Sequence, residues 1–528
     1  MKKILGLMVA LIIVPGLLFA SGSEEQAGAS GARAEQISFP LAEPLELHFL
    51  LQTRLHDDLN ELDVFQRMQE ETNVIINWEI IQSGWDEKKS LLFASNDLPD
   101  AFFGAKALNN VDILDNASFF TPLEDYIADY GPNVQAMFET QPEMEAYVTA
   151  PDGHIYSLPQ RQPNRPVTRF NSFINKAWLD ELGLPMPTTT EEFRTVLEAF
   201  KTGDPNGNGE ADELPLIFNG MNNNSGVNNL FGAFGLTDNT NGDWINLEDG
   251  NLSYLLADDR LVEAVNYFNG LYADGLISSE NFTRQWGQMV ALFRTPDVAT
   301  VGVGFHWTID AAMNNAERAK QYAPLPPLEG PNGDRLWRQA SILTINPVAF
   351  AMPLSNPAKA VTMAYVDQFY DPEVGVELYY GPVGTTLELD ADGVYTVLPS
   401  KEPDLTQDAW LWKYGMNDLS PVYFSKAFEE SIQLGYPDEK AGLDAVFAPY
   451  AEMAEEFPPF LMYTPEEIEE LSILKADINS YATETVSNWI TNGKINEEWA
   501  RYQQQLEAMD LSRMMEIYAA AYDRYTGK

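Results

Sequence analysis

The sequence of 528 residues contains no cysteine and only four histidines, His48, His56, His154 and His306. The absence of cysteine excludes disulfides, thiolate metal sites, iron–sulfur clusters and cysteine nucleophiles. No two histidines lie three or four residues apart, so a histidine-rich transition-metal site would have to be assembled from distant segments. Thiol chemistry is therefore absent from this protein.

Basic residues are also scarce. Lys and Arg total 32 against 79 Asp and Glu, which gives a formal net charge of -47. Such a surface repels phosphate backbones and anionic membranes, and this excludes nucleic acid as a partner. The charge suits a soluble protein or one that attracts cations.

The sequence lacks the common catalytic motifs. It has no G-x-x-x-x-G-K phosphate loop, no G-x-S-x-G and no H-E-x-x-H, and Gly302-x-Gly304 lacks the third glycine of a dinucleotide fingerprint. Among 79 carboxylates some pair could always be chosen as the acidic pair of a glycoside hydrolase. The abundance of Asp and Glu is therefore no evidence for hydrolysis. We therefore predict that the protein is not an enzyme.

The chain has ample material for a large core. Hydrophobic residues make up 45% of it and aromatic residues 12%, with 11 Trp, 23 Tyr and 28 Phe. At about 100–200 residues per domain, the length predicts roughly three domains or two large lobes.

The first residues predict a secretory signal peptide at 1–20. Lys2 and Lys3 precede an apolar run over 4–19, and small residues follow. Cleavage after Ala20 or after Gly22 fits the pattern, and an uncleaved membrane anchor is the alternative. Ser21 stands where a lipoprotein signal carries its cysteine, so no lipidation is expected. Residues 21–42 are typical of a flexible tether, and the mature protein is expected in the periplasm or outside the cell.

The next segments alternate between strand and helix patterns. Residues 45–51 indicate a buried strand, a helical spacing follows over 59–68, and 74–80 alternate as a strand does. A helix after Ser83 and a short strand at 101–103 complete a β-α-β-α-β order, which favours a sheet wrapped by helices. From about residue 406 onward the chain is predicted to be largely helical.

The sharpest local motif is the loop 204–213, which places oxygen donors at relative positions 1, 3, 5, 9 and 10 and glycine at position 6. Calcium prefers six to eight oxygen ligands, which such a loop can wrap around it. We expect side-chain ligation by four residues, the backbone carbonyl of Glu210 and closure by Glu213. The four side-chain ligands are Asp204, Asn206, Asn208 and Asp212.

This loop departs from an EF-hand because Pro215 occupies position 12, where the closing Glu normally stands. A polar Asn/Gly/Asp turn without metal is the alternative interpretation. We favour calcium in a structural role, holding a helix against the strand that begins at Leu214.

Aromatic and charged residues near element ends suggest a sugar site, because sugars offer apolar faces to Trp and hydroxyls to polar side chains. Trp286 lies in a polar stretch, and Trp307 directly follows a buried strand. Packing in the core or on the surface is the alternative for each candidate, and Arg161 is a weaker candidate of the same kind. The predicted ligand-binding residues are Arg54, Trp85, Trp286, Trp307, Trp410 and Trp412.

Several stretches then match one family in order and residue type, namely 85–88, 95–100, 121–125, 152–159, 178–185, 188–193, 204–213, 489–493 and 499–502. Over residues 45–525 the chain resembles the extracellular solute-binding proteins of carbohydrate ABC importers, in the branch of alginate-oligosaccharide-binding and LplA-like proteins. In that branch the loop matching 204–213 is a calcium site. Many members are lipoproteins, and the missing cysteine sets this chain apart from them.

The resemblance implies an α/β fold of the two-lobed type II periplasmic-binding kind, with a hinge, an interlobe cleft and a helix-rich C-terminal part. It also implies a monomer that closes on its ligand and docks on the permease subunits of an importer. We expect 43–165 and 166–305 to begin the N-terminal and C-terminal lobes, with the calcium loop in the second. Residues 306–400 would mostly return to the N-terminal lobe through hinge crossings, and 401–528 would be helical and mostly C-terminal lobe.

The sequence thus predicts an exported binding protein that captures an oligosaccharide by lobe closure and delivers it to an ABC importer. A secreted polysaccharide-active hydrolase or lyase remains an alternative, as does a structural surface protein. Neutral and uronic-acid oligosaccharides are both open as ligands.

Overall fold

The computed structural model describes residues 36–53, 56–163, 166–221, 224–238, 242–338, 345–402, 405, 407–455, 457–458 and 460–527. By its contacts the chain divides into residues 1–36 and a unit of residues 37–528. The predicted signal peptide and most of the predicted tether lie outside the described residues. The described end of the tether already belongs to the fold, since Leu41 N–H donates to the Thr72 carbonyl at 2.9 Å.

The first part of the 37–528 unit, which we call lobe N, is centred on a five-stranded sheet. Its strands, in spatial order, are β2 (Val74–Ile81), β1 (Leu45–Gln52), β3 (Ala101–Phe103), β11 (Ile345–Ala351) and β4 (Ser157–Arg161). Strands β2 and β3 both pair with β1 in parallel, as the predicted β-α-β-α-β order requires, and β11 inserts antiparallel between β3 and β4. The chain therefore returns to lobe N far along the sequence.

Helices and a small second sheet complete lobe N. Aromatic side chains tie them to the main sheet, since the Phe103 ring lies 5.9 Å from Phe49 and 5.6 Å from Phe369, between ring centroids. The remaining elements are η1 (Leu59–Glu61), α1 (Asp63–Thr72), α2 (Trp85–Ser95), α3 (Asn110–Asp115), η2 (Ala117–Phe119), α4 (Glu124–Tyr130), α5 (Pro132–Thr140), α6 (Pro142–Val148), α13 (Lys359–Asp367), η7 (Gln368–Tyr370), α14 (Pro372–Tyr380), β12 (Leu387–Leu389), β13 (Tyr395–Val397), α15 (Gln407–Tyr414), η8 (Asn417–Leu419), α16 (Lys426–Glu430) and β14 (Ile432–Leu434).

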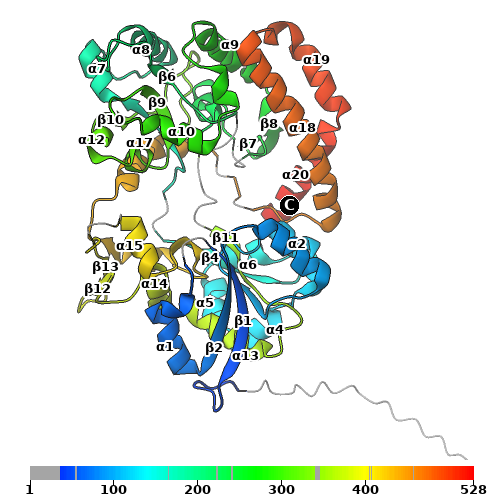
Figure 1. Ribbon diagram of the computed structural model, residues 1–528. Coiled ribbons are helices and arrows are strands. Elements are labelled where there is room, and N and C mark those ends of the chain that lie inside the picture. The colour runs from blue at the N-terminus through cyan, green and yellow to red at the C-terminus, as the bar shows by residue number, and fades with distance from the viewer. Residues whose placement is uncertain are drawn as a thin grey trace, which may run out of the picture. The chain divides into compact units, whose positions relative to one another are not determined.

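A second sheet and core define lobe C, which lies apart from the first sheet in Figure 1. Strand β5 pairs antiparallel with both its neighbours, β10 and β9, whereas the edge strand β6 pairs in parallel with β9. The strands, in spatial order, are β10 (Tyr322–Pro324), β5 (Asn171–Asn175), β9 (Val301–His306) and β6 (Leu214–Leu216), and a separate hairpin joins β7 (Ile245–Glu248) to β8 (Asn251–Tyr254).

Lobe C carries most of the C-terminal helices. The predicted capping box holds, because Thr189 accepts from Glu192 N–H at 3.2 Å and Glu192 accepts from Thr189 N–H at 3.3 Å. The helical elements are α7 (Lys176–Leu182), α8 (Thr190–Thr202), η3 (Val227–Phe234), η4 (Leu255–Ala257), α9 (Arg260–Ala273), η5 (Ser279–Phe282), α10 (Trp286–Phe293), α11 (Ile309–Met313), α12 (Ala316–Ala319), α17 (Glu439–Ala451), α18 (Pro465–Asn492), α19 (Ile495–Ala508) and α20 (Leu511–Thr526).

Two glycines of β9 allow helices to lie against the sheet. A Cβ on Gly302 would come within 2.5 Å of Phe200 on α8, and one on Gly304 within 2.4 Å of Phe293 on α10. No other residue fits at these positions without a shift of the helices. The glycines therefore let α8 and the end of α10 lie against β9, whose last residue, His306, belongs to the candidate site.

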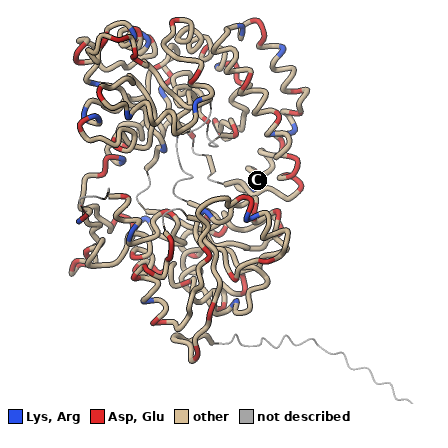
Figure 2. The backbone as a smooth tube through the Cα atoms, in the orientation of Figure 1, with Lys and Arg blue, Asp and Glu red and all other residues tan. Residues whose placement is uncertain are grey.

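The chain passes between the lobes after β4, after β10 and after β14. Elements from β11 to β14 pack on the lobe N core, and from α17 onward most helices pack on lobe C. The acidic residues are spread over both lobes (Figure 2). Among the described helices, no segment combines the length and hydrophobicity needed to cross a membrane.

Candidate ligand site

Three aromatic side chains form a stack at one end of the lobe C sheet. Phe170 precedes β5, His306 ends β9 and Trp286 begins α10. The His306 ring centroid lies 5.0 Å from that of Trp286 and 5.6 Å from that of Phe170, with interplanar angles of 28° and 24°. Trp286 remains 41% exposed, so its indole presents a flat apolar surface to solvent.

A cavity of about 560 Å³ opens beside this stack, lined by Trp286, His306, Val290 and Arg294 among others. Burial, together with the nearby positive charge of Arg294, lowers the pKa of His306 to about 4. The imidazole is therefore neutral at neutral pH, and its Nδ1 has no hydrogen-bond partner in the described part of the chain. A neutral imidazole behind an open indole suits an uncharged ligand.

Trp307, the next residue, lies under a buried lysine. The Lys440 ammonium stands 4.6 Å above the indole centroid and donates a hydrogen bond to the Asn171 side-chain carbonyl. Burial lowers the Lys440 pKa to about 8, while the carboxylates of Asp444 and Asp438 act in the opposite direction. One indole face of Trp307 is thus covered by the cation, which holds the ring at the end of β9.

Trp85 lies in lobe N, in a different cavity. It begins α2 and lines a space of about 320 Å³ together with Lys106, Asn109 and Phe460. Lys106 pairs with Asp418 at 3.1 Å. Trp85 therefore offers lobe N an aromatic surface with polar neighbours, separate from the Trp286 stack.

The other predicted ligand residues are placed elsewhere. Trp410 is 1% exposed and packs within the lobe N core, where its ring meets Tyr414 at 6.1 Å. Trp412 is half-buried, with its ring centroid 6.0 Å from that of His56. Arg54 lies outside the described residues. Arg161 is buried at the end of β4 and pairs with Glu429 at 3.0 Å.

A group of polar residues in lobe C, partly buried, escaped the sequence prediction. Asp243 accepts a hydrogen bond from the Tyr518 hydroxyl at 2.8 Å and pairs with Lys475 at 3.1 Å. Asp238 lies 3.9 Å from a guanidinium nitrogen of Arg338. The only sequence feature that could have indicated this group is the polar run 237–243 between apolar segments. An ordinary surface loop has the same composition, so the run does not indicate a site.

The predicted calcium loop leads from α8 to β6. The Asn206 and Asn208 side-chain amides donate to the two oxygens of Asp212 at 2.9 and 3.1 Å, and Asp204 accepts from Gly209 N–H at 3.1 Å. The donor residues of the motif are therefore drawn together into one ring of polar atoms.

The environment of Glu213 indicates whether this ring of polar atoms suits a cation. Its Oε1 is buried without a hydrogen-bond partner among the described residues. Burial raises the pKa of Glu213, and the negative charges of Asp212 and Asp204 raise it further. A bound cation would stabilise the buried carboxylate and offset the repulsion from the two neighbouring carboxylates. Within the described residues no three His, Asp or Glu side chains stand close enough to hold a metal by themselves, so binding also needs the Asn and backbone oxygens.

No model of a known protein family matches the chain. The chain is 33% identical over 533 residues to the fructooligosaccharide ABC transporter substrate-binding protein FusA of Streptococcus pneumoniae, and 96% of each chain is covered. The solved structure of FusA in complex with kestose has a TM-score of 0.79 at 30% identity, covering 91% of this chain and 99% of that one.

Other solved structures are similar too. An EF-hand mutant of FusA in complex with fructo-nystose has a TM-score of 0.78 at 30% identity, with 91% and 99% of the two chains covered. Alginate-binding AlgQ2, solved without calcium ion, has a TM-score of 0.69 at 22% identity over 93% of this chain and 100% of that one, and it shows likeness of fold. These comparisons confirm the predicted solute-binding fold and favour binding over the hydrolase or lyase alternative.

Proposed function

The chain belongs to the substrate-binding proteins of ABC transporters, and on that premise we propose that it captures an oligosaccharide and delivers it, chemically unaltered, to the membrane subunits of an importer. The observation that carries this proposal is the Trp286 indole, which is stacked on His306 yet 41% exposed beside a cavity. Sugars bind proteins through such open aromatic faces, combined with hydrogen bonds around the ring.

A fructooligosaccharide is the first candidate ligand. FusA, the relative at 33% identity, is named for fructooligosaccharides and has been solved with kestose. The neutral imidazole of His306 and the apolar face of Trp286 suit an uncharged sugar of this kind.

Lobe closure is the proposed mechanism of capture. The Trp286 stack and Trp307 belong to lobe C, whereas Trp85 and Lys106 line a cavity of lobe N. A sugar bound to the residues of one lobe gains contacts with the residues of the other lobe only when the lobes close. Its binding would therefore favour the closed form over the open one. The closed form then docks on the permease subunits.

Calcium is the proposed structural cofactor of the 204–213 loop. Asp204, Asn206, Asn208 and Asp212 would bind it by side chain, with the Glu210 carbonyl and the Glu213 carboxylate. The buried, unpaired Glu213 oxygen supports this, as does the existence of an EF-hand mutant of the relative FusA. The bound ion would hold the end of α8 against the start of β6 and would take no part in sugar recognition.

The protein would work outside the cytoplasm as a monomer. The proposed route is export by the signal peptide at 1–20, without lipidation, because the sequence offers no cysteine to modify. Its place is then the periplasm or the exterior of the cell, where a binding protein of an importer meets its solute.

A ligand screen tests the proposal. Purified protein is heated with kestose, nystose, maltotriose and trigalacturonate, and the melting temperature and tryptophan fluorescence are recorded. We expect at least one oligosaccharide to raise the melting temperature and change the fluorescence, because a ligand that binds only the native state stabilises it. No response to any of these sugars would contradict oligosaccharide capture.

A further inference from the structure

The cavity beside the aromatic stack contains one cationic side chain, that of Arg294. This residue directly follows α10 and lines the cavity of about 560 Å³ together with Trp286 and His306. Arg294 is exposed to solvent, so a ligand in the cavity can reach it. Among the described residues that line the cavity, none is Asp or Glu. A ligand bound here therefore meets one cation and no carboxylate.

Two backbone carbonyls fix the guanidinium of Arg294. Its Nε donates to the Ala312 carbonyl at 3.0 Å, and its Nη2 donates to the Ala311 carbonyl at 2.8 Å. The third nitrogen, Nη1, makes no hydrogen bond and no ion pair within the part of the chain that the structure describes. Ala311 itself lines the cavity, so the anchored guanidinium lies at the cavity wall. The two carbonyls orient the planar group and leave the Nη1 donors available to a ligand.

The residues of α10 that line the cavity share one face of the helix. Trp286, Val290 and Arg294 follow one another at intervals of four residues, and Gly287 and Ala291 lie beside them. Side chains four residues apart lie on the same side of a helix, one turn after another. The open indole and the guanidinium thus stand at the two ends of one face, with small or apolar residues between them.

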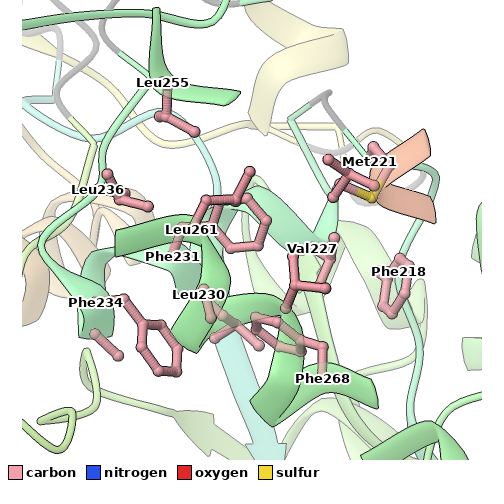
Figure 3. Packing of buried hydrophobic residues seen from close by; sticks show 14 of the residues in the cluster. Phe218, Met221, Val227, Leu230, Phe231, Phe234, Leu236, Leu255, Leu261 and Phe268 are labelled. Carbon is pink, nitrogen blue, oxygen red and sulfur yellow. The ribbon is translucent and has the colours of Figure 1, made fainter. Parts of the chain in front are cut away.

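Both ends of α10 are held in place by the rest of lobe C. Before its start, the Phe282 ring lies 5.2 Å from that of Phe218, between centroids, and Phe218 belongs to the lobe C core (Figure 3). After its end, Arg318 donates to the Thr295 carbonyl at 3.1 Å. The fold therefore sets the positions of the indole and the guanidinium before a ligand arrives, which lowers the entropic cost of binding.

We propose that Arg294 determines the specificity of the sugar site by donating hydrogen bonds from Nη1 to oxygen atoms of a neutral oligosaccharide stacked on Trp286. This inference rests on the proposed function and deepens it by naming a polar residue that recognises the ligand. Stacking alone accepts any ring with an apolar face. A donor fixed at one point of the cavity favours those sugars that place an oxygen there.

The charges of the site and of the whole chain favour a neutral ligand over a uronic-acid oligosaccharide. Such an oligosaccharide carries a carboxylate on each unit, whereas the described lining of the cavity offers Arg294 as its one permanent cation. The formal net charge of -47 also repels an anionic ligand at long range. A neutral sugar avoids both costs and still accepts hydrogen bonds from Nη1.

Calorimetric titration of Arg294→Met tests this role, with kestose, maltotriose and trigalacturonate as ligands. Methionine keeps an unbranched apolar side chain and removes every donor. We expect R294M to raise the Kd of the neutral sugar that the wild type binds best by more than about tenfold, because the ligand loses hydrogen bonds from a charged group.

Arg318→Met is the matched control for structural damage. Arg318 holds the end of α10 but does not line the cavity. We expect R318M to lower the melting temperature of the free protein and to change the Kd by less than about threefold. An equal loss of affinity in R318M and R294M would overturn the inference, because the position of α10 would then account for both.

Arg294→Lys keeps a charged donor, and we expect it to bind the neutral sugar at least about threefold more tightly than R294M does. Arg294→Ala takes the place of R294M if R294M does not fold. A Kd within about threefold of the wild type in the folded R294M or R294A protein would overturn the inference while leaving oligosaccharide capture intact. Tighter binding of trigalacturonate than of either neutral sugar by the wild type would overturn the specificity. A wild type that binds none of the three would remove the proposed function itself.

Discussion

Trp286 and His306 are stacked, with ring centroids 5.0 Å apart and planes 28° from parallel. The two residues are joined by the packing of α10 against β9, which the glycines of that strand permit. The imidazole backs one region of the indole and leaves the rest exposed. Such an arrangement fixes a flat apolar surface before any ligand arrives, so binding does not have to order the side chain.

Removing the indole should weaken ligand binding. Trp286→Ala is expected to raise the Kd for kestose about 5- to 150-fold, equivalent to about 1–3 kcal/mol, because the sugar loses its stacking surface. Trp499→Ala is a suitable control, since Trp499 is a half-buried indole on α19, bonded to Asp259. Titration calorimetry gives both values. Equal affinity of Trp286→Ala and the wild type would remove the stack from the site.

Trp410 should behave in the opposite way. Its side chain is 1% exposed in the lobe N core, so Trp410→Ala is expected to lower the free energy of unfolding by about 3–5 kcal/mol. Denaturant unfolding measures the loss. The Kd of the folded variant for kestose should stay within about threefold of the wild type, and a larger change would show that Trp410 contributes to the site.

Calcium should stabilise the free protein. With calcium at about 100 times its Kd, linkage predicts a gain of about 2.7 kcal/mol, visible as a higher melting temperature that a chelator reverses. Glu213→Gln should lose this response, because it removes the buried carboxylate. Glu210→Gln should keep it, since Glu210 is expected to use its backbone carbonyl. A melting temperature indifferent to calcium and chelator would contradict the site.

His306 should make stability depend on pH. Its pKa is about 4 in the folded protein against 6.5 for the free side chain, so below pH 6.5 the unfolded chain binds a proton that the native state does not. Stability is therefore lost as pH falls from about 6.5 to 4, by about 3 kcal/mol. Asp367, with its pKa raised by burial to about 6, acts in the opposite direction in part of this window.

The difference between the wild type and His306→Gln isolates the histidine from Asp367 and other groups. Denaturant unfolding at several pH values should show that the wild type loses about 3 kcal/mol of stability relative to the variant as the pH falls from 7 to 4. Parallel curves would mean that His306 takes up a proton as readily in the folded protein as in the unfolded chain.

A methyl group on Gly302 should disturb the sheet. Its Cβ would lie 2.5 Å from Phe200 and 2.7 Å from the Pro215 carbonyl, so Gly302→Ala is expected to lower stability by about 1–3 kcal/mol. Gly442→Ala is the control, because no described atom lies within 4 Å of its added Cβ on α17. That variant should gain up to about 1 kcal/mol of stability. Similar unfolding midpoints for the two variants would contradict the close packing.

The sequence predicted features that depend on neighbouring residues. The capping box of Thr189 and Glu192 and the β-α-β-α-β order of lobe N follow from local spacing, and the structure confirms both. The sequence could not distinguish the exposed tryptophan from the buried one. Trp286 and Trp410 both belong to short helices, and only tertiary packing exposes the first and buries the second. Arg338 escaped because its partner Asp238 lies 100 residues away, and no local pattern links them.

The central claim is that the protein holds an intact oligosaccharide without converting it, and native mass spectrometry of the protein incubated with kestose tests it most directly. The account predicts a complex whose added mass equals one whole trisaccharide and stays unchanged over hours. A complex that carries mono- or disaccharide fragments, or free fragments accumulating in solution, would contradict it.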